Sequence, residues 1–475
     1  MATTNFCPLV EEIWPVPDAA DVFRRLARRS HVVFLDSALR HPILGRYSFL
    51  AADPFDYFER PVDDADSLGE LGRRLAHWQQ HAAPVAGLPP FQGGAAGLWS
   101  YDLARPWERL PSPAADEFQA PALAIGFYDV LVALDHVEDR AWIVSQGLPE
   151  LEPRRRGRRA AERLRQMRDW LAAKPPANFG EAWPARLPPL GREDLATQYP
   201  VPGPHGLTSN FSESSYLRAV ERVIDYIYAG DVFQVNLAQR LLLPAADDPA
   251  ALYLRLRQRN PAPFAGYFDL GDFQVISASP ERFLSVRQRE VEARPIKGTR
   301  RFSGIDAGRS SADALCRSEK DRAENVMIVD LLRNDLSRVC QPQSVQVTQL
   351  CRVETYPFVQ HLVSVIRGRL RESCGPIELL RAAFPGGSIT GAPKVRAMEI
   401  IAELEPTARG PYCGSLGYLG FDGAMDLNIL IRTITAGRGW WQAPVGGGIV
   451  AQSDPREEYE ETWTKADGLL RSLSP

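Results

Sequence analysis

The sequence predicts an α+β fold with antiparallel sheets. Three observations carry this prediction: short β-branched and aromatic runs alternate with segments of helical periodicity, the connections between them are short, and several neighbouring strands look joined as hairpins. The clearest hairpin joins residues 127–134 to residues 141–145 through the turn D-H-V-E-D. Because parallel strands need long crossover connections, these short links favour antiparallel pairing over a doubly wound parallel sheet.

Composition and charge are those of a large globular protein. The chain has 475 residues, 45% of them hydrophobic and 24% charged, a length that suggests two or three domain-sized units. The net charge of -4 gives no electrostatic reason to expect nucleic acid or an anionic membrane as a partner. The N-terminus lacks the features of a signal peptide, and no apolar run approaches the roughly 18 residues of a membrane span. Six scattered cysteines predict free thiols in a reducing cytoplasm, and the dispersed histidines show no zinc-ligand spacing.

Composition and periodicity divide the chain into three segments. Residues 1–150 mix short strands with helical spacing at 18–30 and 68–81. Residues 151–207 combine a basic helix with a proline-rich linker. Arginines cluster in that helix and can suggest nucleic-acid contact, but a solvated helix face is favoured because no aromatic residues are interleaved with them. Residues 208–475 alternate more regularly between helices and strands.

The third segment opens with a helix that runs to Ala229, with Ser212 or Ser214 as its N-terminal cap and Gly230 as its stop. Two β segments then meet at Pro280, since proline cannot donate to a strand ladder. The other elements expected are a helix at 313–338, a strand at 345–355, a helix at 377–383, hairpins across 417–450 and a closing helix at 456–473.

The stretch E-A-R-P-I-K-G-T-R-R, residues 292–301, presents a lysine in an unusual setting. A β-like run ends at Pro295, and Gly298 lets the backbone turn tightly or approach a ligand closely. Lys297 is therefore expected on a stiffened turn. A lysine held there can act as a nucleophile, provided that part of it is neutral. Taken by itself a solvated turn lysine is the commoner case, so the other motifs must decide.

Carboxylates gather on two predicted helices. Glu458, Glu461 and Lys465 share one face of the closing helix, and Asp321 and Glu324 stand three residues apart before an apolar run. Two such helices that converge would form a four-carboxylate site for a hard divalent cation such as Mg2+. A solvated acidic face with pairs such as Glu461–Lys465 is an equal alternative.

Two glycine-rich stretches, residues 384–394 and 444–450, are expected to be turns whose backbone N–H groups can hold a carboxylate or phosphate. Neither matches the nucleotide-binding loop G-x-x-x-x-G-K-[ST], so ATP binding is not supported. Each can equally be a tight β-turn. Arg432 lies in an apolar strand pattern, where an arginine usually meets a buried anion.

Five of these motifs together resemble the chorismate-utilising enzyme family, which includes anthranilate, aminodeoxychorismate, isochorismate and salicylate synthases. The resemblance covers residues from about 210 to 470 in order and is very specific, and it extends more weakly over the first 150 residues. It implies a four-layer α/β/β/α sandwich with two antiparallel sheets, with residues 208–475 as the chorismate-binding catalytic domain and residues 1–150 as a region like that of anthranilate synthase component I. The motifs are S-A-S-P-E-R-F, P-I-K-G-T, A-E-N-x-M-I-V-D-L-L-R-N-D, F-P-G-G-S-I-T-G-A-P-K and E-E-Y-E-E-T-W-x-K-A.

The resemblance also implies roles for single residues. Mg2+ would be held by Glu324 and Glu461, with Asp321 and Glu458 supporting them directly or through water, and it would bind the ring carboxylate of chorismate. Glu281 matches the acid that protonates the departing 4-hydroxyl, and Lys297 would add at C2 to give a covalent adduct. The residues that match the substrate-binding positions are Gln234, Gly298, Thr299, His361, Tyr412, Arg432, Gly446, Gly447, Gly448 and Lys465. Asp36 and Ser37 resemble part of the family's tryptophan pocket, although a β-edge turn explains them equally well.

Two positions separate the members of the family. Anthranilate synthases typically carry alanine where this chain has Lys297, and P-I-K-G-T resembles the aminodeoxychorismate synthases. Isochorismate and salicylate synthases place a lysine base at the position of Gln234, so water addition is disfavoured here. The implied reaction converts chorismate and ammonia to 4-amino-4-deoxychorismate, on the way to 4-aminobenzoate and folate. No glutaminase-type nucleophile elbow is found, so a separate glutamine amidotransferase subunit is expected to supply the ammonia.

Three other functions were weighed against this one. The nearest is anthranilate synthase component I, which Lys297 disfavours. A non-catalytic, tryptophan-binding protein of the same fold is disfavoured because all the metal and acid positions are filled. A Mg2+-dependent hydrolase built on paired carboxylates remains open until the resemblance is taken into account, and it would need an activated water.

Overall fold

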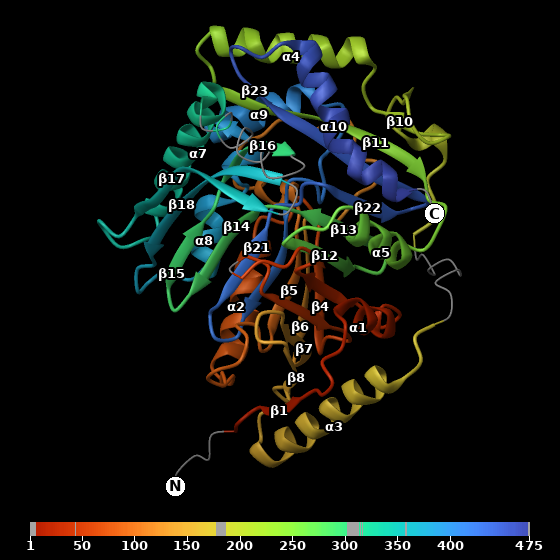
Figure 1. Ribbon diagram of the computed structural model, residues 1–475, viewed down its shortest axis with the longest axis vertical. Coiled ribbons are helices and arrows are strands. Elements are labelled where there is room, and N and C mark those ends of the chain that lie inside the picture. The colour runs from red at the N-terminus through yellow and green to blue at the C-terminus, as the bar shows by residue number, and fades with distance from the viewer. Residues whose placement is uncertain are drawn as a thin grey trace.

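The computed structural model describes residues 6–42, 44–176, 187–301, 313, 315, 317–356 and 359–473. Within these residues the strands form two antiparallel sheets, one of 13 strands and one of 10. Figure 1 shows β1 (Leu9–Glu12) and β8 (Arg140–Ser145) toward the lower end of the molecule and β23 (Trp440–Ile449) near its upper end. The predicted α+β class with two antiparallel sheets is therefore confirmed.

The larger sheet begins and ends with short edge strands and contains the long central pair β11–β23. In spatial order its strands are β1 (Leu9–Glu12), β8 (Arg140–Ser145), β7 (Val130–Asp135), β3 (Tyr47–Ala51), β2 (Val33–Asp36), β12 (Phe264–Asp269), β13 (Phe273–Ser279), β22 (Thr433–Gly437), β23 (Trp440–Ile449), β11 (Gln234–Pro244), β10 (Thr208–Ser209) and β9 (Tyr199–Pro200), with β19 (Gly391–Ala392) paired to β11.

The smaller sheet has β16 at one edge and β4 at the other. In spatial order its strands are β16 (Ile296–Arg301), β18 (Val359–Arg369), β15 (Glu290–Ala293), β14 (Arg282–Arg287), β21 (Met425–Asn428), β20 (Ser415–Gly420), β5 (Gly94–Trp99), β6 (Leu123–Tyr128) and β4 (Asp56–Arg60), with β17 (Gln346–Tyr356) paired to β18.

Helices cover the outer faces of the two sheets, which gives the predicted four layers. Between the sheets a buried core joins Phe49 and Phe268 of the larger sheet to Leu98 and Leu416 of the smaller one. The larger sheet is covered by α1 (Ala19–Leu26), α3 (Pro153–Ala172), α4 (Glu213–Tyr228), α5 (Pro249–Arg259), α9 (Lys394–Leu404) and α10 (Pro455–Leu473), and the smaller one by α2 (Ser67–Gln79), α7 (Glu319–Ser337) and α8 (Pro376–Ala383).

The three segments distinguished by texture do not form separate sheets. In the larger sheet β2 pairs with β12, and in the smaller sheet β5 pairs with β20. Both sheets are therefore shared: in each one a block of strands from residues 1–150 joins a block of later strands through a single strand pair. The linker region also contributes β9 and the short 3-10 helix Arg192–Asp194.

Helix ends follow the expected capping chemistry. Ser212 caps α4, and its side chain accepts a hydrogen bond from the Ser215 N–H. Of the two serines offered by the sequence, Ser212 is thus the cap. Ser318 caps α7 in the same manner by accepting from the Asp321 N–H, which fixes where the carboxylate-bearing first turn of that helix begins.

Two of the places where the chain crosses from one sheet to the other lie next to each other. One crossing, at 280–281, links β13 to β14, and the other, at 429–432, links β21 to β22. The Ile429 N–H donates to the Glu281 carbonyl at 3.0 Å, so the two crossings are hydrogen-bonded to each other. Arg432 has φ +51° and lies in the second crossing. The prediction that it sits inside a strand was wrong, because the strand is interrupted where the chain changes sheets.

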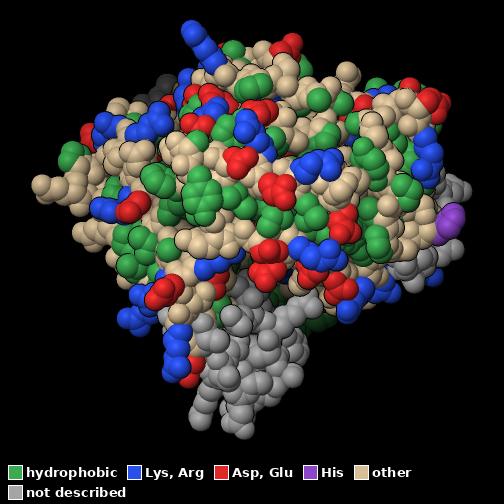
Figure 2. Space-filling view, turned by 90° about the horizontal axis from the view of Figure 1, so that it is seen from above, with side chains coloured by type: hydrophobic (Ala, Val, Ile, Leu, Met, Phe, Trp, Pro, Cys, Tyr) green, Lys and Arg blue, Asp and Glu red, His purple; other side chains and the backbone are tan. Residues whose placement is uncertain are grey.

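The basic helix α3 is bound to the rest of the protein by two of its arginines. Arg163 donates to Asp129 at 3.2 Å and to Asp53 at 2.7 Å, and Arg156 donates to the Gln146 carbonyl at 2.8 Å. Both arginines are buried, whereas Arg158 is exposed, so the solvated-face prediction holds for only part of the helix. In Figure 2, acidic and basic side chains are interspersed over the face shown, without a field of one sign. Within the described residues, no helix has the length and apolarity to cross a membrane.

Candidate active site

Lys297 lies on β16 at the edge of the smaller sheet. The register with β18 shifts between Lys297 and Thr299, and Gly298 at this bulge has φ +66°, a conformation that glycine adopts without strain. The sequence predicted that Lys297 lies on a turn. The structure instead places it in a strand with a β-bulge, because pairing with β18 begins directly after Pro295. The Lys297 Nζ lies 3.3 Å from Glu324 Oε2 of α7, and the two side chains are only 13% and 12% exposed. The solvated-lysine alternative is excluded by this burial.

Glu281 stands at the first crossing between the sheets, and its side chain is buried. It accepts a hydrogen bond from the Ser388 hydroxyl at 2.9 Å and another from the Ile296 N–H. Burial raises the pKa of Glu281 to about 7, against the opposing effects of Ser388 and of the nearby Lys297 ammonium. A carboxyl group of this pKa holds a proton near neutral pH and can donate it to a leaving group.

Two further carboxylates of the site, Glu458 and Glu461, are each paired with a lysine. Glu458 accepts from Ser453 at 2.6 Å and pairs with Lys320 at 3.2 Å, and burial raises its pKa despite these partners. Glu461 pairs with Lys465 at 2.6 Å. Burial tends to raise the pKa of Glu461, but the lysines outweigh it, and the pKa is lowered. The expected pair Glu461–Lys465 is present, and it points into the site.

The four carboxylates do not form a ready metal centre. In the described part of the chain, no three His, Cys, Asp or Glu side chains are placed to hold a metal ion. Carboxylate oxygens are nevertheless suitable ligands for a hard cation. Three of them already act on one positive charge, because Glu458, Glu324 and Glu461 all raise the pKa of Lys320. Glu458 and Glu461 also converge on Gly447, where a Cβ would lie 3.2 Å from Glu458 Oε2 and 3.7 Å from Glu461 Oε1. An ammonium thus occupies the place that suits a divalent cation.

The glycines 446–448 lie within strand β23, paired with residues 236–238 of β11. The prediction of a turn was wrong here. The glycines are instead part of a strand, and their lack of side chains lets residues of the site approach the backbone closely. A Cβ at Gly448 would lie 2.1 Å from Gln234 Nε2 and 3.4 Å from Lys297 Nζ. The Gly446 carbonyl accepts from Lys465 at 2.8 Å.

Gln234 is fully buried, and neither its Oε1 nor its Nε2 has a hydrogen-bond partner. A buried amide without partners is costly unless a ligand completes it. Because Gln234 adjoins the Lys297 amine across Gly448, it offers a donor and an acceptor to a molecule bound beside that lysine.

The remaining predicted residues lie around the same space. His361 on β18 is buried, and burial together with the Arg432 charge lowers its pKa to about 4, so it is neutral at pH 7. Tyr412 is buried, with its ring under the Arg409 guanidinium at 5.9 Å. Asp321 packs over Gly298. The backbone of Thr299 pairs with His361, but its side chain lies outside the described residues.

Two residues of the site were not singled out from the sequence. Ser388 lies in the quoted motif F-P-G-G-S-I-T-G-A-P-K, and a hydroxyl among glycines is the signal that points to it. Lys320 is adjacent to Asp321, but only the convergence of α7 and α10 shows that it faces Glu458.

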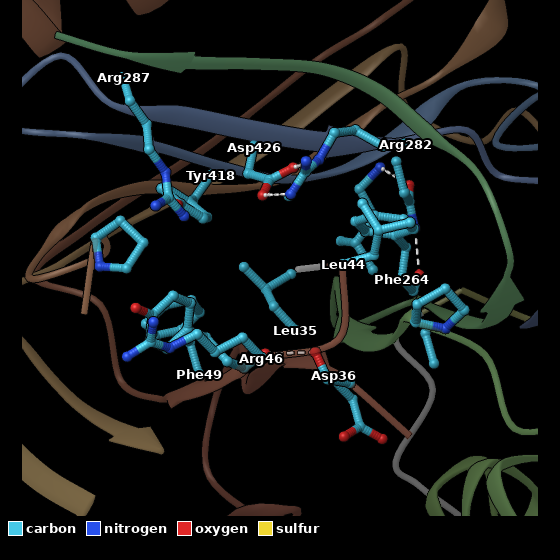
Figure 3. A pocket seen from close by; sticks show the side chains of 18 residues that line it. Leu35, Asp36, Leu44, Arg46, Phe49, Phe264, Arg282, Arg287, Tyr418 and Asp426 are labelled. Carbon is cyan, nitrogen blue, oxygen red and sulfur yellow. Dashed lines mark hydrogen bonds and ion pairs between the residues drawn. The ribbon is translucent and has the colours of Figure 1, made fainter. Parts of the chain in front are cut away.

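A separate cavity of about 70 Å3 lies between the two sheets, where residues of the first and third segments meet (Figure 3). Leu35, Phe49 and Phe264 make its apolar wall, while Arg46, Arg282 and Arg287 supply positive charge. Asp36 and Ser37 belong to its lining, but Figure 3 shows the Asp36 carboxylate directed away from the centre. That carboxylate accepts hydrogen bonds from Tyr253 at 2.9 Å and Arg257 at 2.6 Å, and the Ser37 hydroxyl donates to the Tyr47 carbonyl. The polar groups of both residues are thus engaged within the protein.

Residues 42–471 match the family described as chorismate binding enzyme. The chain belongs to this family. The aminodeoxychorismate synthase component 1 of Escherichia coli (strain K12) is 42% identical over 475 residues, with 97% of each chain covered. The anthranilate synthase component 1 of Thermus thermophilus is 38% identical over 463 residues, covering 95% of this chain and 94% of the relative. The crystal structure of anthranilate synthase component I from Streptococcus pneumoniae TIGR4 has a TM-score of 0.76 at 30% identity, over 91% of this chain and 94% of that one.

Membership of the chorismate-binding enzymes confirms the resemblance stated from the motifs, and the structural neighbour agrees with the two-sheet fold. Relatives of similar identity carry the names of two different synthases. Within this family, the choice between them therefore depends on the residues of the site.

Proposed function

We propose that this chorismate-binding enzyme converts chorismate and ammonia to 4-amino-4-deoxychorismate, as an aminodeoxychorismate synthase component 1. The observation that carries the proposal is the buried Lys297 amine, which lies among carboxylates and within electrostatic reach of Glu281. An acid and a nucleophile that face one space are what a displacement through a covalent adduct needs. Relatives that carry this name support the choice.

In the proposed reaction, an amino group from ammonia replaces the 4-hydroxyl of chorismate, which leaves as water. The neutral Lys297 amine bonds to C2 of the ring, the two ring double bonds shift, and the C4–O bond breaks. Glu281 supplies the proton with which the 4-hydroxyl leaves as water. Ammonia then bonds to C4, the double bonds shift back, and the C2–N bond to Lys297 breaks. Lys297 leaves as the neutral amine, and Glu281 is regenerated when the new C4 ammonium gives a proton to the carboxylate.

The ring carboxylate requires a positive partner during both displacements. Glu324 and Glu461 would hold Mg2+, with Asp321 and Glu458 supporting them, in place of the lysines that now neutralise this cluster. When bound, Mg2+ would neutralise the ring carboxylate and draw electron density toward it. Charge on this cation site would thus lower the barrier to addition at C2.

The other residues would bind and orient the substrate. Arg432, Tyr412 and the backbone amides of 446–448 would hold the enolpyruvyl carboxylate. Neutral His361 can donate or accept a hydrogen bond without adding charge, since its pKa is about 4. The unpartnered amide of Gln234 offers hydrogen bonds to the substrate and, unlike a lysine, cannot activate water. Addition of water at the ring is accordingly disfavoured.

The ammonia would come from a glutamine amidotransferase subunit, as component 1 in the names of the relatives suggests. The product would serve 4-aminobenzoate and folate synthesis in the cytoplasm. The cavity lined by Asp36 and Ser37 would take tryptophan, with its ring against the apolar wall and its carboxylate toward the arginines.

Anthranilate synthase component I is the second candidate, because a relative with that name is 38% identical over nearly the whole chain. Purified protein, chorismate, Mg2+ and ammonium salt, followed by mass-spectrometric analysis of the products, separate the two candidates. We expect 4-amino-4-deoxychorismate as the main product. Anthranilate as the main product would overturn the proposal.

A further inference from the structure

A buried ion pair lies behind the candidate active site and takes no part in the chemistry proposed above. Arg409 and Glu405 follow α9 and are 3% and 5% exposed. The guanidinium donates to both carboxylate oxygens of Glu405, at 2.9 and 2.6 Å. Burying two charges is costly, and a pair of this kind is retained only where its geometry is well satisfied.

The pair satisfies its remaining hydrogen-bonding capacity on two backbone segments. Arg409 donates to the Ile389 carbonyl at 2.9 Å and to the Asn236 carbonyl at 2.7 Å. Glu405 accepts from the Ala238 N–H at 2.9 Å. A planar fork of five N–H donors is what lets one side chain bind a carboxylate and two carbonyls at once.

Each segment that the pair holds carries a residue of the site. Strand β11 carries Gln234, and the 3-10 turn Gly387–Ile389 carries Ser388, whose hydroxyl donates to Glu281. The turn is also tied to β11 by the Asn236 N–H, which donates to the Thr390 carbonyl at 2.8 Å. Tyr412 lies under the same guanidinium.

We propose that the Arg409–Glu405 pair is a positioning unit for the proton donor, holding the turn Gly387–Ile389 against β11 so that Ser388 stays hydrogen-bonded to Glu281. The inference rests on the proposed acid role of Glu281. It makes Ser388 and Arg409 positioning residues, since neither needs to touch the substrate.

The pH dependence of the rate tests whether Ser388 is hydrogen-bonded to Glu281. The Ser388 hydroxyl favours the carboxylate form of Glu281, so its loss should raise the pKa of the acid. The other groups that face Glu281 are the Lys297 ammonium from β16, the Ile296 N–H and the Cys413 thiol. These stay in place when Ser388 is changed to alanine. Ser388→Ala should therefore move the alkaline limb of the rate profile to higher pH.

Arg409→Lys keeps the charge but replaces the fork by one ammonium, which cannot serve Glu405 and both carbonyls. We expect the ammonia-dependent rate to fall about 10- to 100-fold, the range for loss of an outer partner of a site residue. The alkaline limb, measured at constant NH3 concentration, should move in the same direction as in Ser388→Ala. In the double variant the second change should add little, because both act through one hydrogen bond.

Arg240→Lys is the matched control, because Arg240 on β11 forms a buried pair with Glu117, both side chains being 7% exposed. It should cost stability but leave the alkaline limb where it is in the wild type. If Arg409→Lys does not fold, Glu405→Gln takes its place, since it keeps the shape of the side chain and one acceptor oxygen for Arg409.

Three results would overturn the inference: an unmoved limb in Ser388→Ala, an unmoved limb in a folded Arg409 or Glu405 variant, or effects of the two changes that multiply in the double variant. The product formed by the wild type is identified first. An unexpected wild-type product therefore counts against the proposed function, while the limb shifts test the positioning unit separately.

Discussion

At the scale of single residues, Glu281 carries the clearest pH signature. Burial raises its pKa to about 7, so its protonated form is populated below that pH and is lost as the pH rises through it. At constant NH3 concentration, the wild-type rate should therefore fall on the alkaline side of about pH 7. Glu281→Gln cannot donate the proton and should lower the rate about 10²- to 10⁴-fold. A steady-state pH series checks both statements, with the exposed Glu290→Gln as control, and wild-type activity in Glu281→Gln would contradict them.

The carboxylate cluster makes a second prediction at this scale. Glu324→Gln and Glu461→Gln each remove a charge from the proposed cation site, and the Mg2+ concentration for half-maximal activity should rise at least about tenfold. Glu457→Gln on the exposed side of α10 should leave it unchanged. Metal titrations of the initial rate measure this requirement. An unaltered Mg2+ dependence in both site variants would remove these glutamates as ligands.

The sequence singled out Lys297, Glu281 and Glu324, but neither the pairing of Lys297 with Glu324 nor the role of Ser388. Lys297 and Glu281 stand in short motifs with unusual local chemistry, so a sequence pattern can reveal them. The ion pair of Lys297 with Glu324 and the hydrogen bond from Ser388 join residues far apart in the chain. Such contacts depend on how elements pack, which local periodicity does not encode.

At the scale of elements, helix α3 is held on the N-terminal strands by charges that the sequence suggested were mostly solvated. Asp129 is fully buried, and Arg163 is its nearest cation. Arg163→Met leaves that carboxylate without its main partner and should destabilise the protein by about 3–5 kcal/mol. Denaturant unfolding measures this loss. The ammonia-dependent rate of the folded variant should stay close to that of the wild type, because α3 is remote from the site.

Arg158→Ala is the control for α3, because Arg158 is exposed and should contribute little to stability. Equal stability losses for the two variants would contradict the structural role of Arg163. Helix existence and type were predictable here from periodicity. Which arginines are buried was not predictable, because that depends on the acceptors offered by Asp129, just before β7, and by Gln146, just after β8.

At the scale of the whole molecule, strands from both ends of the sequence share both sheets. Composition separates residues 1–150, 151–207 and 208–475, but strand pairing joins the first and the last segments through β2–β12 and β5–β20. Composition and periodicity depend on neighbouring residues in the sequence, whereas the order of strands in a sheet depends on contacts between residues hundreds of positions apart. The two antiparallel sheets were thus predictable, through the family resemblance, while the strand pairs that join the first and last segments within each sheet were not.

The sharing of both sheets by the first and last segments predicts how pieces of the chain behave. Residues 208–475 expressed alone would expose the edges of β12 and β20 and the apolar core between the sheets, so the piece should aggregate. Co-expression with residues 1–173 should restore a soluble, active complex. Size-exclusion chromatography and the ammonia-dependent rate report the outcome. A soluble, fully active 208–475 piece would show that the catalytic half needs no strands from the first segment.

The central claim is that the Lys297 amine becomes bonded to the substrate, and intact-mass analysis tests it most directly. Protein incubated with chorismate and Mg2+ in the absence of ammonia should gain the mass of chorismate less water, and added ammonium should discharge this adduct. Lys297→Ala should show no gain in mass. An unmodified wild-type protein, together with undiminished formation of 4-amino-4-deoxychorismate by Lys297→Ala, would contradict the account.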